Sequence, residues 1–254
     1  MSVFVTADLH LSTHADTNKS MEVFGGRWID YTERLEKAWR ALVAERDTVV
    51  IAGDISWALT LEEALSDLSF IHRLPGQKIL LKGNHDFWWS TASKLAAFCQ
   101  KHKLDSLHFL HNNAYVADDF LICGTRGWFH DSTADGAKHA MAEYDKVVAR
   151  ECVRLSLSVE AADKLARETE RPLERICFLH FPPLWADTLC QPIIDGLKKH
   201  DIHRLYFGHI HGASPTHFVH DGIDMTLISA DALGFVPQIL FHSENWSSTD
   251  QRHQ

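Results

Sequence analysis

The sequence predicts an α/β fold built around parallel strands. Short apolar runs rich in β-branched and aromatic residues recur along the chain, and amphipathic patterns with helical spacing separate them. No Pro/Ser-rich linker or internal repeat divides the 254 residues. The five clearest strand runs cover residues 2–7, 47–52, 77–82, 175–180 and 203–208. We therefore expect a single domain over residues 1–242, followed by a polar tail at 243–254.

Helices are expected between the strands of the first half, at residues 31–46, 60–72 and 91–102. Asp30 is the expected N-cap of the first helix, with Glu33 three residues later as its capping-box partner. Thr60 and Glu63 form the same pattern at the start of the second helix. Helices in these places predict right-handed crossovers between parallel strands.

The pattern changes in the middle of the chain. Residues 107–125 read as two or three short strands, with Asp118 and Asp119 at a turn, and antiparallel pairing is expected there. Further strand runs are expected at residues 216–220, 223–230 and 236–241.

Residues 138–170 have a charged amphipathic pattern that predicts two helices broken around residues 156–158. The expected buried stripe comprises Val148, Cys152, Leu155, Ala162 and Leu165. The plain interpretation is a helical segment that covers the sheet. A cap that gates a substrate site is the alternative, and the sequence leaves both open.

The chain carries 34 acidic and 25 basic residues, for a formal net charge of -9. Such a surface has no general attraction for nucleic acid or anionic lipid, which argues against both as partners. A polyanionic substrate would need a local source of positive charge.

Several features predict a cytoplasmic protein. No apolar run approaches the ~18 residues needed to span a bilayer, and the first residues read as a strand, without a basic leader. The five cysteines form no C-x-x-C pair, which is typical of free thiols in a reducing compartment.

Histidine is unusually frequent, with 18 in the chain. Five strand candidates run directly into residues with metal-binding atoms. These segments are Asp8-Leu-His10, Gly53-Asp54, Gly83-Asn-His-Asp86, His180 and Gly208-His-Ile-His211. Because the carboxyl ends of parallel strands share one edge of a sheet, we expect these groups to converge.

Mixed imidazole and carboxylate ligands suit manganese, iron or zinc better than calcium or magnesium. The number of candidate ligands exceeds what one transition ion takes. Two ions ~3.5–4 Å apart with a shared carboxylate would use them all, and this arrangement serves phosphoester hydrolysis.

The order D-x-H, G-D, G-N-H-D, lone His and G-H-x-H, over residues 8–211, resembles the calcineurin-like metallophosphoesterase superfamily, in particular its small bacterial-type phosphohydrolases. The resemblance implies a four-layer αββα sandwich with two mixed β-sheets flanked by helices. It also implies one ion held by Asp8, His10 and His211, a second held by Asn84, His180 and His209, and Asp54 bridging them.

For the reaction, we expect a metal-bridging hydroxide to hydrolyse a phosphomonoester or phosphodiester. His85 is not needed as a ligand and is placed to protonate the leaving group, with Asp86 orienting its ring. Two alternatives stay open: a scaffold of the same fold that binds metal without catalysis, and a metal-dependent amide hydrolase.

The substrate is expected to be a phosphorylated small molecule, with nucleotides among the candidates. Where many relatives have a second acid after the G-D block, this chain has Ile55-Ser56-Trp57, which argues against a serine/threonine protein phosphatase. Arg126 is a candidate phosphate ligand because a guanidinium matches phosphate geometry. Trp57 is a candidate pocket wall.

Overall fold

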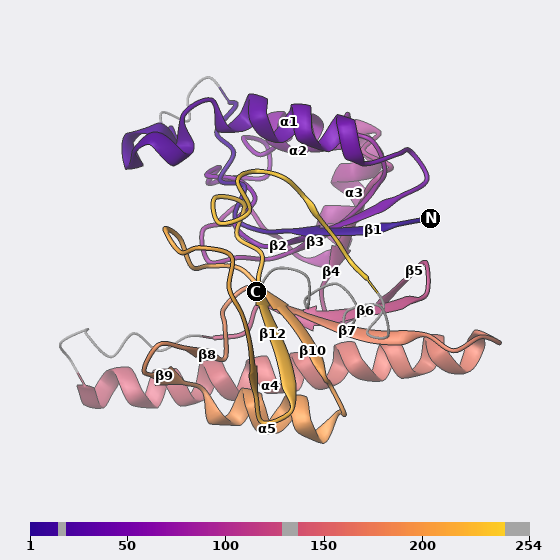
Figure 1. The fold of residues 1–254 in the computed structure, drawn as a ribbon, viewed down its shortest axis with the longest axis vertical. Helices are drawn as coiled ribbons and strands as arrows, with labels where there is room; N and C mark the ends of the chain where they lie inside the picture. The colour runs from indigo at the N-terminus through magenta and orange to yellow at the C-terminus, as the bar shows by residue number, and fades with distance from the viewer. Residues whose placement is uncertain (15–18, 129–136, 242–254) are drawn as a thin grey trace, which may run out of the picture.

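Two β-sheets pack face to face, and helices cover the outer face of each (Figure 1). The structure is a computed structural model and describes residues 1–14, 19–128 and 137–241. The first sheet has the order β13-β1-β2-β3-β4, with all pairs parallel except β13 with β1. Its strands are β1 (Val3–Thr6), β2 (Thr48–Ala52), β3 (Gln77–Leu81), β4 (Leu107–Leu110) and β13 (Gln238–Ile239).

The second sheet has the order β11-β12-β10-β7-β6-β5, parallel in its four central strands and antiparallel at both edges. Its strands are β5 (Tyr115–Ala117), β6 (Phe120–Thr125), β7 (Glu174–Leu179), β10 (Arg204–Phe207), β11 (His217–His220) and β12 (Ile223–Leu227). A small hairpin pairs β8 (Leu184–Trp185) with β9 (Thr188–Leu189).

The helices form the outer layers. Three lie on the first sheet, α1 (Tyr31–Leu42), α2 (Leu65–His72) and α3 (Ala92–His102), and two on the second, α4 (Ala137–Glu168) and α5 (Gln191–Lys199) (Figure 1). Three separate hydrophobic clusters lie between the four layers. In β1, Val3 and Val5 point into the cluster between the sheets, and Phe4 points toward the helices, as strand alternation requires. The predicted sandwich of two mixed sheets flanked by helices is confirmed.

The predicted helix starts of the first half are partly wrong. Asp30 precedes α1 but adopts a left-handed conformation and makes no side-chain capping hydrogen bond. Thr60 Oγ1 does accept a hydrogen bond from the Glu63 amide, yet this bond closes a separate turn, and α2 begins only at Leu65. The third expected helix, at 91–102, is α3, and Thr91 is its N-cap, accepting a hydrogen bond from the Lys94 amide.

The predicted break around residues 156–158 is also wrong, because α4 runs through this segment as one helix. Ser158 reaches from α4 into the second sheet, where its hydroxyl donates to the Asn113 carbonyl and accepts from the Gly124 amide. Serine serves here as an anchor between layers. The helix packs on β6 and α5, as a covering helix does.

The middle strands pair differently from the expectation of purely antiparallel contacts. Only β5 and β6 form an antiparallel pair, whereas β4 joins the first sheet in parallel with β3. The chain thus changes sheets between β4 and β5. The polar tail at 243–254 lies outside the described residues.

Candidate metal centre

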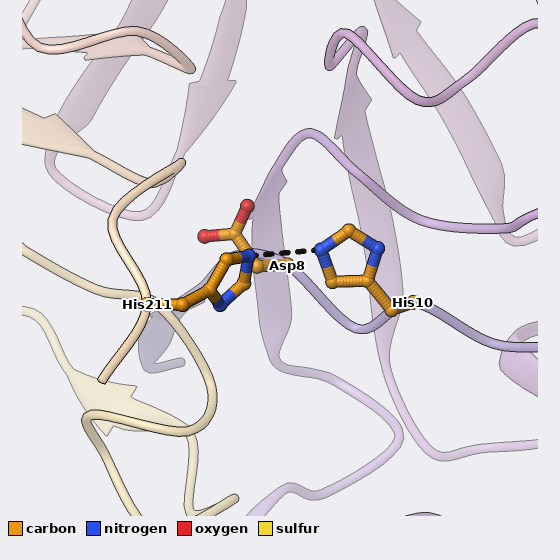
Figure 2. A group of neighbouring side chains, drawn as sticks. All are labelled: Asp8, His10 and His211. Atoms are coloured by element: carbon orange, nitrogen blue, oxygen red, sulfur yellow. Dashed lines mark hydrogen bonds between the residues drawn. The ribbon is translucent and has the colours of Figure 1, made fainter. Parts of the chain in front are cut away.

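The candidate ligands gather at one edge of the sandwich, where the loops after β1, β2, β3, β7 and β10 meet. They form two groups, and within each group the ligand atoms all lie within 4.8 Å of one another. One comprises Asp8, His10 and His211 (Figure 2), and the other comprises Asp54, His180 and His209. Asn84 joins the second group, with its Oδ1 2.7 Å from Nε2 of His180. All seven predicted ligands are therefore close together.

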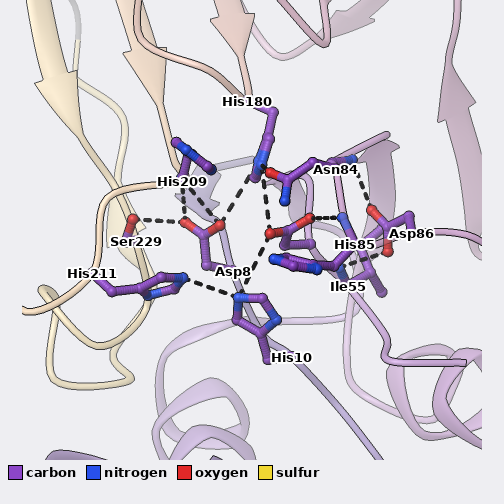
Figure 3. A network of polar contacts seen from close by, with 12 residues as sticks. Asp8, His10, Ile55, Asn84, His85, Asp86, His180, His209, His211 and Ser229 are labelled. Atoms are coloured by element: carbon purple, nitrogen blue, oxygen red, sulfur yellow. Dashed lines mark hydrogen bonds and ion pairs between the residues drawn. The ribbon is translucent and has the colours of Figure 1, made fainter. Parts of the chain in front are cut away.

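Asp54 lies between the two groups (Figure 3). Its Oδ2 atom is 3.6 Å from Nε2 of His10 and 3.5 Å from Nε2 of His180. This oxygen is buried and has no hydrogen-bond partner among the described residues. A buried carboxylate oxygen without a donor is unstable unless a cation compensates it. The donor set therefore fits a pair of metal ions that share Asp54.

The backbone at the cluster is strained. Asp8, His10, Asp54 and His209 all have positive φ angles, between 46° and 70°. Residues other than glycine adopt this region at a conformational cost, and such residues concentrate at functional sites. The turn out of each strand directs these side chains toward the sheet edge.

Two glycines admit neighbouring ligands. A Cβ added at Gly208 would lie 2.6 Å from Oδ2 of Asp8, and one added at Gly83 would overlap the Asp54 carboxylate. A larger residue at either position would therefore collide with a ligand carboxylate.

The pKa values of the site show how the protein alone disfavours charge there. Burial raises the pKa of Asp8 to about 8 and that of Asp54 to about 6. Burial likewise lowers the pKa of His180 and of His209 to about 3. Bound cations reverse the preference at the carboxylates and favour the neutral imidazoles, which is the protonation state that metal ligands need.

His85 lies beside the cluster without belonging to either ligand group. Its backbone amide donates to Oδ1 of Asp54 at 2.7 Å, and its ring centroid is 4.4 Å from that of Trp57. Its ring has no hydrogen-bond partner among the described residues, so it is open to a ligand.

Asp86 makes contacts that differ from the predicted one. Its carboxylate accepts hydrogen bonds from the amides of Ile55, Ser56 and Gly83 and from Nε1 of Trp88. No described hydrogen bond joins it to the His85 ring. Asp86 holds the loop after β2 against the loop after β3, which fixes His85 through the backbone.

Two residues of the site carried no assigned role in the sequence. Asp231 Oδ1 lies 3.1 Å from Nδ1 of His211, and Ser229 Oγ donates to Asp8 Oδ2 at 2.6 Å. Hydrogen-bonding partners of this kind orient metal ligands. Both residues follow β12, and nothing in their local sequence sets them apart from ordinary loop residues.

A cleft of about 600 Å³ opens beside the cluster. Trp57 forms part of its wall and stacks on His10, with ring centroids 4.9 Å apart. Trp28, which the sequence did not single out, contributes a second indole. Arg126 lines a different cleft, where its guanidinium lies 3.7 Å from Oε1 of Glu151.

The sandwich and the carboxylate–imidazole cluster at its edge together define a metal-binding phosphoesterase. The chain belongs to the calcineurin-like phosphoesterase family, whose family model matches residues 1–213. Members of this family hydrolyse phosphate esters, so the chain is a hydrolase of that general kind.

Comparison with solved structures found several similar proteins, and the first of the three below, with a TM-score above 0.5, has the same fold. A protein from Thermus thermophilus is 11% identical, covers 91% of this chain and 89% of its own, and gives a TM-score of 0.53. A phosphopantetheinyl hydrolase from Mycobacterium tuberculosis is 15% identical over 100% of this chain and 93% of its own, with a TM-score of 0.49. A protein of unknown function from Aquifex aeolicus is 15% identical, covers 94% of this chain and 95% of its own, and gives a TM-score of 0.43.

The search of curated proteins gave no match. Among the described residues, no helix has the length and apolar character needed to cross a membrane.

Proposed function

We propose that the protein is a dinuclear-metal-dependent phosphoesterase that hydrolyses phosphomonoesters or phosphodiesters. The observation that carries the proposal is the position of Asp54. Its Oδ2 has no hydrogen-bond partner in the described part of the chain and lies within 3.6 Å of a histidine from each ligand group. A single ion would leave one of these groups unused. Manganese, iron and zinc suit the mixture of nitrogen and oxygen donors.

The ligands divide between two positions. Asp8, His10 and His211 hold one ion, and Asn84, His180 and His209 hold the other, with Asp54 shared. When bound, divalent ions activate water as a nucleophile near neutral pH and stabilise negative charge on the phosphoryl group. The ions also supply the local positive charge that this acidic chain needs to attract phosphate.

His85 acts as the proton donor to the leaving oxygen. It faces the cleft that Trp57 and Trp28 line, and its ring is free of intramolecular hydrogen bonds among the described residues. The Asp54 carboxylate and the Asp86 loop contacts hold its backbone in place. Positioned acids of this kind contribute roughly 10²–10⁴-fold to the rate.

The cleft favours a substrate with an apolar or aromatic leaving group. Met21, Phe24, Trp28 and Trp57 present their side chains there, next to His10 and His211. Indole rings stack on flat groups, so a phosphorylated small molecule such as a nucleotide suits this wall. The five unpaired cysteines suit a reducing, cytoplasmic setting.

The proposal is tested by metal analysis and a substrate panel on the full chain. We expect two ions per chain after reconstitution with manganese, and turnover of p-nitrophenyl phosphate or bis(p-nitrophenyl) phosphate. An anilide of the same chromophore serves as the amide control. Metal binding without any turnover would support the scaffold instead, and anilide cleavage without ester cleavage would support the amide hydrolase.

A further inference from the structure

A second cleft, of about 520 Å³, opens at the carboxyl ends of β3, β4 and β6. Lys82 and residues 89–91 line it, whereas His85, in the same loop, lines the cleft at the metal cluster. The loop after β3 therefore contributes to both clefts. Arg126 also connects the second cleft to a candidate metal ligand, since its carbonyl accepts a hydrogen bond from the His180 amide at 3.1 Å.

The second cleft is positively charged, although the protein as a whole is acidic. Among the residues that the structure describes, four basic side chains line it and one acidic side chain does, which leaves an excess of three positive charges. The basic residues are Lys82, Arg126, Arg150 and Arg154, and the acid is Glu151. Like charges repel strongly where water is partly excluded, so a cluster of this kind favours an anionic ligand.

Glu151 already has hydrogen-bond and ion-pair partners within the protein. Glu151 is buried, accepts hydrogen bonds from Thr125 Oγ1 at 2.6 Å and Arg154 at 2.7 Å, and lies 3.7 Å from Arg126. It holds two arginines in position at the cleft floor. Lys82 and Arg150 form no salt bridge with any described residue.

The cleft also has more hydrogen-bond donors than acceptors. Nε1 of Trp89 and Nε of Arg126 are buried without a partner among the described residues, and Trp89 is only 9% exposed. Both groups can only donate. Buried donors of this kind are stable when an acceptor reaches them, and oxyanions offer several acceptor oxygens at once.

We propose that this cleft is a second anion subsite, which binds a phosphoryl-type oxyanion through Lys82, Arg126 and Arg150. The oxyanion is either a free phosphate ion or a second phosphoryl group on the substrate. The subsite is separate from the metal ligands, so it binds its anion whether or not metal is present.

The test measures binding of inorganic phosphate to the full chain after metal removal, by calorimetry at low ionic strength. Wild-type protein is expected to bind one phosphate ion, and Arg150→Gln and Lys82→Gln to bind it about tenfold more weakly, as loss of one charge-assisted hydrogen bond predicts. Arg150 is exposed, so its replacement should leave the fold intact. The matched control is Arg167→Gln, an exposed arginine of α4 outside the cleft, which should bind phosphate as the wild type does.

Absence of phosphate binding by the wild type, or equal affinity in Arg150→Gln and the wild type, would overturn the subsite. A second experiment, with metal-loaded protein, distinguishes a free phosphate ion from a second phosphoryl group on the substrate. If Arg150→Gln raises KM more for a nucleoside bisphosphate than for p-nitrophenyl phosphate, the anion is a second phosphoryl group of the substrate. Equal KM changes together with weakened phosphate binding identify a free ion. The phosphate-binding measurement needs no turnover, so its result is independent of the proposed phosphoesterase activity.

Discussion

Oδ2 of Asp54 lies 3.6 Å from Nε2 of His10, in the interior of the protein, and no described group donates a hydrogen bond to it. A side chain from the loop after β2 thus reaches the ligand group that follows β1. The same oxygen is 3.5 Å from His180, at the end of β7 in the other sheet. The candidate metal centre consequently lies where the two sheets meet.

Replacing this shared carboxylate should remove metal without unfolding the protein. Asp54→Asn keeps the shape of the side chain but loses its charge, so both ions lose a ligand. We expect metal content to fall below two ions per chain and kcat/KM to fall by at least about 100-fold, the scale of one lost electrostatic group. Elemental analysis and ester hydrolysis measure this, with exposed Asp187→Asn as control. Full metal content in Asp54→Asn would contradict the bridging role.

Replacing His85 should impair catalysis but leave metal binding intact. His85→Ala should lower kcat about 10²–10⁴-fold, as expected for loss of a general acid, while two ions stay bound. The loss should be smaller for substrates with good leaving groups, because these need less protonation. The control is His203→Ala, whose side chain is 70% exposed. Unchanged kcat for a poor leaving group would remove His85 from the mechanism.

Asp231 should tune the metal site through its contact with the His211 ring. Burial acts to raise the pKa of Asp231, but hydrogen bonds from His211 and the Gly212 amide outweigh it and hold that pKa below its usual value. Asp231→Asn removes this charge beside His211, so we expect metal affinity to fall about 10–100-fold. Titration with a competing chelator measures the affinity. Excess metal should restore turnover, and failure of that rescue would indicate a direct catalytic role.

The metal-free protein should lose stability as pH rises toward about 8. Burial raises the pKa of Asp8 to about 8, against 3.8 for the ordinary side chain. Between these values the folded state holds a proton that the unfolded state has released, so the free energy of unfolding decreases as pH rises. The lowered pKa values of His180 and His209 affect the free energy of unfolding only below about pH 6.5, the ordinary histidine pKa.

Thermal unfolding of the chelator-treated protein at pH 6.5 and pH 8 tests this expectation. The wild type should have the lower Tm at pH 8, and Asp8→Asn should show a smaller drop, since it has no proton to release. For a chain of this size, each kcal/mol corresponds to about 2–4 °C in Tm. The control is exposed Asp30→Asn. An equal drop in Asp8→Asn and the wild type would assign the pH dependence to other groups.

Parts of the fold were within reach of sequence analysis, because strand runs and helical periodicity are local. The β-branched run at β2 and the helix expected at 91–102 behave as their sequences indicate. Ser158 shows where local patterns fail. A serine in a helical stretch suggests a break, but its hydroxyl found partners on the neighbouring sheet, and the helix continued.

The seven candidate ligands were also predictable, since each follows a strand and strand ends in an α/β sheet share an edge. Asp231 and Ser229 were not, because an aspartate and a serine after β12 resemble ordinary loop residues until their partners are known. The contacts of Asp86 with two loops, and the separation of Arg126 from the Trp57 cleft, likewise depend on distances between segments far apart in the chain.

By itself, the sequence determined the chemistry: which residues carry metal-binding atoms, and that they stand at strand ends. Only the tertiary structure decided how these groups share their neighbours, because packing two sheets together sets which side chains lie within a few ångströms of one another. That packing left one oxygen of Asp54 without a donor from any residue that the structure describes, and it gathered Lys82 and Arg150 in a cleft separate from the metal ligands.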